Sequence, residues 1–408
     1  MKKILYITSG YLPYTFSENL CNAKLVYALQ QKGWQIDVIT KVDEGPTYSA
    51  TWQEPWLELR SRCHEISYPL GSKLSRTFDL LYSTMIMGYP LTGIRWARRA
   101  YQKAEELIKQ NDYDAVFTRS PDDIPHIVGY KLKRKYGIPW VANWNDPSAT
   151  IWPKPYKSYI PPKVEKMLNK YTIACLKNAD INTFPSQSLL DHFTKFFPFL
   201  TSSQTQVIPH IALSENLYKS RTRVNKDKLY MCHSGNLSTE RDPELLFKAM
   251  RKLIDLGRDK IQLDIMGQSN AFVQELVDIY QLKDYVKFLN GYPYMEAVHK
   301  LLDYDVLVLL EAKLEFGIFF ASKFTDYAQA SRTILAVSPQ NGFAKDILTR
   351  NGGGVVVNNE DENDIFVGLN HLYELWTKNQ LDQAYSSEKL LAQFSSSRVV
   401  SLYESLKF

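Results

Sequence analysis

Lys323 and Asp326 lie three residues apart, directly after Ser322, and their types suit an anionic ligand that also carries hydroxyl groups. Ser322 is a favourable N-cap residue for a short helix, which is predicted to precede a buried strand at 333–337. The free amides and the dipole at a helix start favour an anion, and Lys323 adds a full positive charge. The pattern predicts a nucleotide diphosphate site, with Lys323 and the amides of the helix start at the phosphates and Asp326 at the ribose hydroxyls.

The same residues also allow a purely structural interpretation. Asp326 would then only complement the helix dipole, and Lys323 would be a solvated surface charge. From these residues alone, both interpretations stay open.

Glycine turns after predicted strands form a second group of candidate ligand residues. The residues of these turns are Gly235, Asn236, Gly267, Asn290, Gly291 and Tyr292. Arg241 follows the first of these turns, and its forked donors suit phosphate oxygens. Each turn could be an ordinary strand–loop–helix connection. Because the carboxyl ends of parallel strands share one edge of a sheet, we expect the turns to converge there.

Candidate catalytic and acceptor-side residues lie in the first half of the chain. His126 follows a strand-end loop and could contact an acceptor hydroxyl or the donor sugar, or be a satisfied helix histidine. Asp146 ends a strand before a proline, where a carboxylate could face a cleft or only form a turn. Glu18 and Asn19 lie in the loop after the first predicted strand, where an acceptor is expected.

Short apolar runs alternate with amphipathic helical patterns such as 20–32, 96–110 and 243–256. The predicted strands form two series, 4–8, 36–40, 115–118, 140–144, 181–184 and 206–209, then 229–232, 262–266, 286–289, 306–310, 334–337 and 354–357. This alternation predicts an α/β protein with parallel sheets covered on both faces. Two series predict two Rossmann-like, doubly wound domains that face each other across a cleft.

The expected domains are 1–218 and 219–385, followed by a C-terminal helix within 386–408 that crosses back to the first domain. The polar, basic stretch 214–228 has little apolar periodicity and marks the expected seam. A chain of 408 residues exceeds what one core usually supports, which agrees with two domains.

The composition is that of a soluble globular protein, with 45% hydrophobic and 23% charged residues. The net charge of +5 is too small and too scattered to indicate nucleic-acid binding. The four cysteines have no metal-ligand spacing, so we expect neither a metal site nor disulfides. Buried thiols, a short N-terminal apolar run and no spanning window favour a cytoplasmic protein.

One region could contact the inner face of the plasma membrane. Residues 76–99 are rich in aromatic and aliphatic side chains with arginines beside them, and 131–135 form a second basic cluster. Apolar and basic residues together suit peripheral attachment to an anionic leaflet. The alternative is a core helix followed by a solvated one.

The order of these motifs resembles the nucleotide-sugar half of the GT-B glycosyltransferases, and more narrowly the retaining family 4, or group 1, enzymes. The segments that carry the resemblance are Gly235-Asn236-Leu237, Arg241-Asp242-Pro243, Gly267, Gly291-Tyr292, 322–327 and 332–336, with 11–13, 33–40, 112–116, 137–147, 179–180, 185–186 and 207–209 in the first half. The resemblance covers nearly the whole chain.

The resemblance implies transfer of a sugar from a UDP- or GDP-type donor to a glycan or lipid-linked acceptor in bacterial surface polysaccharide synthesis. It implies a diphosphate site at the Gly235–Asn236 turn, Arg241, Ser322 and Lys323, with Asp326 at the ribose. Nucleobase contacts would come from Gly267, Asn290, Gly291 and Tyr292. The reaction would be retaining, metal-independent and without a cofactor, because fixed cations and helix amides neutralise the leaving diphosphate.

Two departures from the family pattern motivate alternatives. The family often has two glutamates eight positions apart; aligning Asp326 with the second puts Ile318 at the first. The usual glycine-rich loop of the first half is replaced by 15–19. A non-catalytic GT-B partner or glycan-binding protein is one alternative, and a nucleotide-sugar 2-epimerase on the same fold is another. A nicotinamide dehydrogenase is disfavoured because no GxGxxG follows the first strand.

Overall fold

The computed structural model describes all residues except 45–50, 70–71, 120–121, 220–226 and 290. The chain divides into two compact units. Unit 1 comprises Met1–Trp152, Lys157–Ile211 and Ser396–Phe408, and unit 2 comprises Pro153–Tyr156 and Ala212–Ser395. The division thus falls at 211/212 and 395/396, whereas the sequence analysis placed the boundaries at 218/219 and 385/386.

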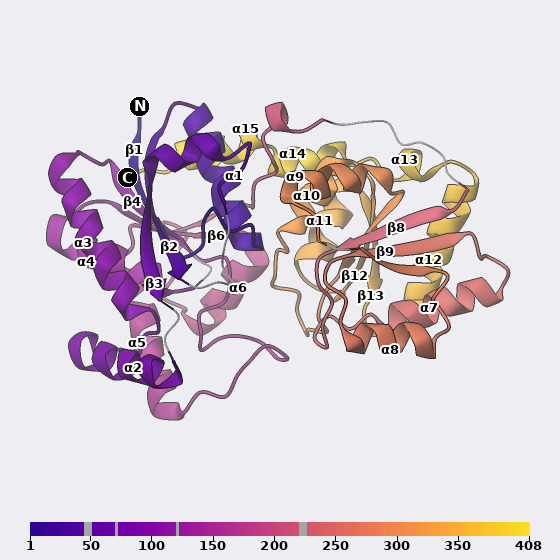
Figure 1. The fold of residues 1–408 in the computed structure, drawn as a ribbon, viewed down its shortest axis with the longest axis horizontal. Coiled ribbons are helices and arrows are strands. Elements are labelled where there is room, and N and C mark those ends of the chain that lie inside the picture. Colours follow the sequence, from indigo (N-terminus) through magenta and orange to yellow (C-terminus); the bar gives the residue numbers. More distant parts are fainter. Residues whose placement is uncertain (45–50, 70–71, 120–121, 220–226, 290) are drawn as a thin grey trace. The chain divides into compact units, whose positions relative to one another are not determined.

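Unit 1 contains a seven-stranded parallel sheet in the order β3-β2-β1-β4-β5-β6-β7 (Figure 1). The strands are β1 (Lys3–Thr8), β2 (Gln35–Glu44), β3 (Cys63–Pro69), β4 (Ala115–Arg119), β5 (Trp140–Asn143), β6 (Ile181–Phe184) and β7 (Thr205–Val207). The helices are α1 (Ser17–Gln31), α2 (Lys73–Met87), α3 (Ile94–Gln110), α4 (Ile124–Tyr136), α5 (Pro162–Asn178), α6 (Gln187–Phe196) and α15 (Ser396–Glu404). Helices α3 and α4 pack together on the sheet, and α1 packs with α15.

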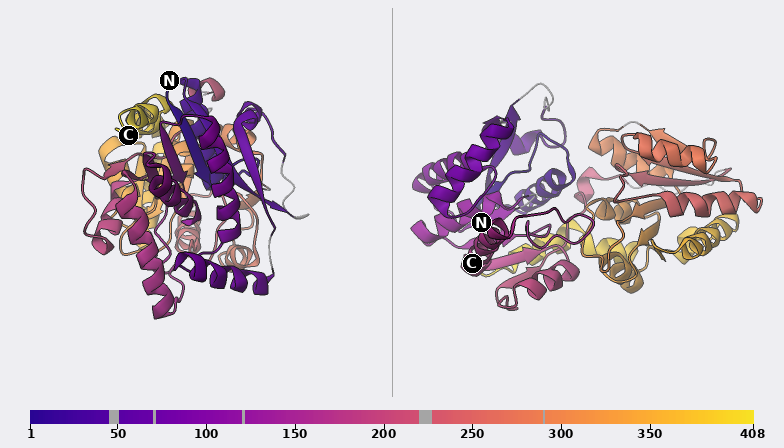
Figure 2. Two further views of the ribbon diagram at one scale, coloured as in Figure 1. Left: turned by 90° about the vertical axis from the view of Figure 1, so that its left-hand side faces the viewer. Right: turned by 90° about the horizontal axis from the view of Figure 1, so that it is seen from below.

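Unit 2, whose main segment is drawn from salmon to yellow in Figure 2, contains a six-stranded parallel sheet. The strand order is β10-β9-β8-β11-β12-β13. The strands are β8 (Leu229–Ser234), β9 (Ile261–Met266), β10 (Val286–Leu289), β11 (Val306–Leu310), β12 (Thr333–Ser338) and β13 (Gly354–Asn358). The helices are α7 (Glu244–Asp255), α8 (Ala271–Ile279), α9 (Tyr294–Lys300), α10 (Lys323–Ala330), α11 (Phe343–Asn351), α12 (Glu362–Thr377), α13 (Leu381–Ala384) and α14 (Glu388–Phe394). The two strand orders are those of doubly wound sheets, which confirms two Rossmann-like units.

The core of unit 2 shows why its strands read as continuous apolar runs. Met231, Val308 and Leu335 point to one face of the sheet, where α7 and α12 supply the covering side chains. Cys232 and Ala336 point to the opposite face, which is covered by aromatic residues of α10 and α14. Because successive strand residues point to opposite faces, a sheet covered on both sides needs apolar residues at every position.

Each predicted strand overlaps an observed one, and the structure adds β3, which the sequence analysis did not predict. Strand β3 lies at the edge of its sheet and contains His64, Glu65 and Ser67. An edge strand is covered less completely, so it does not require a continuous apolar run. Among the described residues, no helix is long and apolar enough to cross a bilayer.

Candidate active site

Tyr327 of α10 fixes the start of that helix against the ends of two strands in unit 2. Its side chain is fully buried. Its hydroxyl accepts a hydrogen bond from the Ser234 amide at 2.8 Å and donates to the Val308 carbonyl at 3.2 Å. Lys323 lies four residues before Tyr327 and therefore on the same helix face. The helix start is thus held over the loop that follows β8.

The Lys323 ammonium lies directly over Gly235, the first residue after β8. Gly235 has φ +121°, and a Cβ atom there would be 2.7 Å from Lys323 Nζ. A side chain at this position would displace the ammonium, so only glycine allows the approach. His233 Nε2 is 3.4 Å from the same Nζ. Because His233 Nδ1 donates to the Val308 carbonyl at 3.0 Å, Nε2 presents a lone pair to the lysine.

Three ionisable side chains gather at this point. Burial, together with the nearby Arg241 guanidinium, lowers the pKa of Lys323 to about 7. Burial raises the pKa of Glu311 to about 7, although Arg241 and Lys323 act in the opposite direction. Arg241 itself is exposed. The site thus holds two cations beside a desolvated carboxylate. Because burial removes water from Lys323 and Glu311, an anion that enters the site would take the place of the lost water.

Ser322 and Asp326 differ in how they match their predicted roles. Ser322 holds the N-cap position of α10 as predicted, but its backbone is already helical and its side chain makes no capping hydrogen bond. Its carbonyl instead accepts from the Thr325 amide and hydroxyl, at 3.2 and 2.9 Å. Asp326 Oδ1 accepts a hydrogen bond from the Tyr294 hydroxyl at 2.9 Å. Asp326 remains partly exposed, one helical turn from Lys323.

The loops after β8 and β9 are in close contact. A Cβ at Gly267 would lie 2.5 Å from the Gly235 carbonyl oxygen. Asn236 Oδ1 accepts a hydrogen bond from the Gln268 amide at 2.8 Å, so this side chain joins the two loops. The structure therefore brings together Gly235, Asn236, Arg241, Gly267 and Lys323.

The predicted nucleobase residues are described only in part. Asn290 lies outside the described residues. Gly291 is exposed, and an added Cβ there would meet no atom within 4 Å. Tyr292 is partly buried, and the Lys300 ammonium lies 4.9 Å from the centre of its ring.

Unit 1 places carboxylates at the corresponding edge of its own sheet. Burial and the nearby Asp146 carboxylate raise the pKa of Glu18 to about 7. Asn145 Nδ2 donates a hydrogen bond to Glu18 Oε2. Burial and Asp122 raise the pKa of Asp123 to about 7, with a smaller contribution from Asp146. Two carboxyl groups that titrate near neutrality suit general acid–base chemistry.

His126 and Asn19 are core residues of unit 1, which corrects their predicted roles. His126 is fully buried, its Nδ1 lies 2.8 Å from Thr118 Oγ1, and its ring centre lies 4.2 Å from that of Trp144, with the two planes tilted by 42°. Burial lowers its pKa to about 3, so it stays neutral. Asn19 is buried and donates to the Tyr11 carbonyl at 2.6 Å. Neither side chain is available to a substrate in this structure.

The sequence analysis missed Glu311, His233 and Tyr327. A signal was available for Glu311, because it directly follows the predicted strand 306–310 at the expected edge. His233 and Tyr327 gave no such signal, because a buried strand histidine and a helix tyrosine are ordinary core residues.

One group in the described part of unit 1 has the composition of a metal site. Ligand atoms of Glu18, Cys21 and His210 lie within 4.8 Å of one another. The Arg119 guanidinium interacts with both Glu18 and Cys21, and these neighbours raise its pKa. A permanent cation beside two of the three potential ligands disfavours a second cation there.

Family comparisons divide the chain in the same way as the fold. Residues 22–211 match the family described as Glycosyltransferase Family 4, and residues 214–389 match the family described as Glycosyl transferases group 1. No curated protein matches the chain.

Solved structures share the fold along nearly the entire chain. Sucrose-phosphate synthase from Thermosynechococcus elongatus is 15% identical with a TM-score of 0.69, over 99% of this chain and 98% of that one. HepE from Anabaena in complex with UDP is 13% identical with a TM-score of 0.65, over 99% and 98%. MnaA of S. aureus with UDP is 16% identical with a TM-score of 0.56, over 99% and 96%. The protein is thus a glycosyltransferase enzyme of the GT-B fold, whose first half matches Glycosyltransferase Family 4 and whose second half matches Glycosyl transferases group 1.

Proposed function

We propose that the protein transfers a glycosyl residue from a UDP- or GDP-type nucleotide sugar to a glycan or lipid-linked acceptor. The observation that carries the proposal is the Lys323 ammonium, seated over Gly235 and beside Arg241. A cation over partly exposed loop backbone suits the oxygens of a diphosphate. Asp326, one helical turn away, suits ribose hydroxyls. HepE was solved with UDP and with UDP-glucose, which supports a donor of this class.

In the proposed reaction the bond between the sugar's anomeric carbon and the diphosphate oxygen breaks, and a bond to the acceptor oxygen forms. The acceptor's proton goes to the leaving diphosphate, on the same face of the sugar, and this gives retention. Arg241 and Lys323 stabilise the charge that develops on the leaving group. These cations supply the positive charge from the chain itself, so we propose a metal-independent reaction without a cofactor.

Glu311 is the residue proposed to contact the donor sugar. It directly follows β11, and its carboxylate lies close to both phosphate-binding cations. A carboxylate there would be repelled by phosphate but can accept hydrogen bonds from sugar hydroxyls. For the acceptor side we propose Glu18 and Asp146, whose carboxylates interact in unit 1. We place the reaction in the synthesis of a bacterial surface polysaccharide.

The test is a panel of UDP- and GDP-sugars incubated with the protein, with and without a glycan and lipid extract. We expect one donor to release nucleoside diphosphate faster with the extract, and NMR to show the sugar joined to an acceptor. A donor epimerised at C2 without acceptor would indicate a 2-epimerase instead. Absence of turnover with every donor, despite binding, would indicate a non-catalytic protein.

Lys323→Ala is the variant that tests the site itself. Loss of a charged hydrogen bond costs about 1.5–3 kcal/mol, so donor affinity should fall roughly 10- to 100-fold. Lys287→Gln, at an exposed lysine of β10, is the matched control and should bind as the wild type does. Equal donor affinity for Lys323→Ala and the wild type would contradict the assignment.

A further inference from the structure

Helix α2 of unit 1 presents an apolar stripe to solvent. Its members are spaced at i, i+4, i+7, i+8, i+11 and i+12 and so share one helix face. They are Leu74, Phe78, Leu81, Tyr82, Met85 and Ile86, with exposed fractions of 73, 66, 56, 36, 86 and 56%. All six side chains of this stripe are therefore exposed to solvent.

The opposite face of α2 is held by polar contacts. Asp79 is 4% exposed, forms a salt bridge with Arg95 and accepts from the Tyr68 hydroxyl at 3.3 Å. Ser83 is fully buried; its hydroxyl donates to the Tyr89 carbonyl at 2.6 Å and accepts from the Leu91 amide at 3.1 Å. The usual amphipathic arrangement is inverted, because polar groups anchor the inner face while apolar groups cover the outer one.

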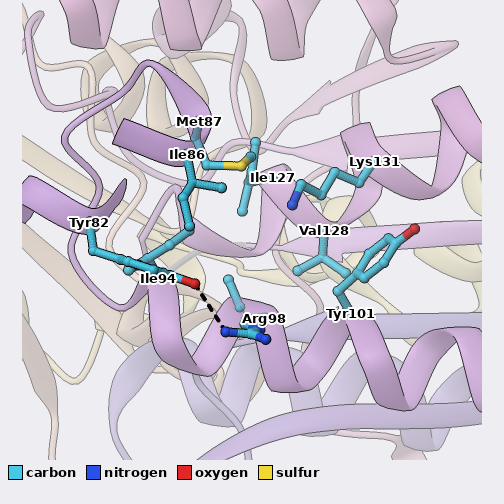
Figure 3. Close-up of a pocket in the computed structure, with 10 residues that line it drawn as sticks. Tyr82, Ile86, Met87, Ile94, Arg98, Tyr101, Ile127, Val128 and Lys131 are labelled. Carbon is cyan, nitrogen blue, oxygen red and sulfur yellow. Dashed lines mark hydrogen bonds between the residues drawn. The ribbon is translucent and has the colours of Figure 1, made fainter. Parts of the chain in front are cut away.

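A groove with apolar walls and a cationic rim adjoins this stripe (Figure 3). It has a volume of about 40 Å³. In Figure 3, Ile86 and Met87 of α2 face Ile127 and Val128 of α4, and Ile94 lies beside Tyr82. Tyr82 points to Arg98, which donates to its hydroxyl at 3.0 Å, and Lys131 lies across the groove. A neighbouring hollow of about 540 Å³ adds Tyr130, Arg134 and Lys135.

Most cations of this rim are available to an anionic partner. Lys135 is paired with Glu105. Arg98, Lys131 and Arg134 form no salt bridge within the described part of the chain. Arg98 and Arg134 are exposed, and Lys131 lies 5.5 Å from the centre of the Tyr101 ring. Glu105, which pairs with Lys135, also acts on Lys131, so the face combines a projecting apolar stripe with an excess of positive charge at its edge.

We propose that this face, formed by the α2 stripe with Arg98, Lys131 and Arg134, docks on an anionic lipid bilayer. The stripe enters the boundary between headgroups and acyl chains, and the three cations contact headgroup phosphates. The negative charge of the lipid headgroups complements the positive charge of this face, which favours an anionic bilayer as the partner. A symmetric contact between two copies of the chain would bring the same cations together and would be repelled. The inference does not depend on which donor or acceptor the enzyme uses.

Vesicle co-sedimentation of the full-length protein tests the proposal. We expect binding to phosphatidylcholine vesicles that contain phosphatidylglycerol, weaker binding at high salt, and little binding to pure phosphatidylcholine. Each cation near an anionic surface contributes about 1 kcal/mol, so Arg98→Gln/Arg134→Gln should lower the partition coefficient at least tenfold. The double control Lys287→Gln/Lys378→Gln removes two exposed lysines of unit 2 and should bind normally.

The apolar stripe is tested by Met85→Glu, whose position is 86% exposed and therefore tolerates the change in the folded state. We expect loss of vesicle binding, whereas Ile279→Glu, at an apolar residue of unit 2 that is 58% exposed, should bind as the wild type does. A Phe78→Trp variant should show, relative to the wild type, additional indole fluorescence that shifts to the blue on vesicles and is quenched by brominated lipid.

Three results would each overturn the proposal: equal binding to neutral vesicles, wild-type binding by Met85→Glu, or added fluorescence of the Phe78→Trp variant that vesicles leave unshifted. A dimer that Met85→Glu dissolves, without vesicle binding, would also overturn it, because the occupant would be a second copy.

Discussion

Lys323 is the residue on which the proposed donor site depends, because a phosphate would need its positive charge while burial disfavours that charge. Its pKa is lowered to about 7, so the free protein loses this charge as the pH rises through neutrality. Because the pKa of Glu311 is raised to about 7, its carboxyl group gains a negative charge over the same pH range. Both changes act against an anion, and a bound diphosphate should raise both pKa values again.

We therefore predict that affinity for a nucleotide sugar falls about tenfold between about pH 6 and about pH 8.5, with proton uptake on binding. The donor's diphosphate diester does not titrate in this range. Calorimetry in buffers of different ionisation enthalpy measures both quantities. For Lys323→Arg, only the part of the pH dependence that Glu311 causes should remain. For Lys323→Arg/Glu311→Gln, the donor affinity should be nearly independent of pH. An affinity that rises with pH would contradict the charge assignment.

A second prediction at this scale concerns stability. The folded-state pKa of Glu311 is raised, so its ionisation opposes folding increasingly as the pH rises through its unfolded and then its folded pKa. Glu311→Gln should stabilise unit 2 by roughly 1 kcal/mol at about pH 8 and by less at about pH 5.5, since partial exposure reduces the full effect. Thermal unfolding at the two pH values measures the difference. A larger gain at the lower pH would be inconsistent with a desolvated carboxylate.

At the scale of elements, α10 and the end of β8 act together, because Tyr327 joins Ser234 to Val308. Tyr327→Phe removes both hydrogen bonds. The Val308 carbonyl keeps His233 Nδ1 as a donor, but the partly buried Ser234 amide loses its acceptor, which should cost about 1–3 kcal/mol. Donor affinity should also fall, since the Lys323 position depends on this contact. Urea unfolding and calorimetry measure the two effects.

Tyr304→Phe is the matched control for that prediction. The Tyr304 hydroxyl, also in unit 2, donates to Asp264 Oδ2 at 2.9 Å and is buried. We expect a comparable loss of stability and unchanged donor affinity. A Tyr327→Phe variant that binds the donor as tightly as Tyr304→Phe would show that this contact has no part in positioning the site.

The elements also show how far the sequence determines the fold. Interior strands such as β11 and β12 are covered on both faces, and their apolar runs made them predictable. Edge strand β3 was missed because Cys63–Pro69 mixes polar and apolar residues. The Gly235, Arg241 and Lys323 assembly was predictable because strand-end loops share one edge. The core positions of His126 and Asn19 were not, because a polar residue in a helix can face either way.

At the scale of the whole molecule, the chain returns to its first unit at the end. Helix α15 belongs to unit 1, where Lys2 Nζ donates to the Leu406 carbonyl at 3.4 Å, so the two termini lie side by side (Figure 1). The buried Arg119 guanidinium donates to the Tyr403 hydroxyl at 2.7 Å and to Asn22 Oδ1 at 2.7 Å. This buried cation connects β4, α1 and α15.

Tyr403→Phe should therefore destabilise unit 1 by about 1–3 kcal/mol, because it removes an acceptor from a buried cation. Tyr136→Phe, whose partly exposed hydroxyl donates to Glu105, is the control and should change stability by less than about 0.5 kcal/mol. Hydrogen exchange of α15 amides should accelerate only in Tyr403→Phe. Equal exchange in both variants would mean that the Arg119 contact does not hold the C-terminal helix.

Unit 2 is proposed to hold a nucleotide sugar by its diphosphate, between the loop after β8 and the start of α10. A crystal structure of the protein with UDP tests this proposal most directly. We predict phosphate oxygens within hydrogen-bond distance of Lys323 Nζ and the Arg241 guanidinium, with a ribose hydroxyl at Asp326. A nucleotide bound elsewhere, with these three side chains free of it, would contradict the account.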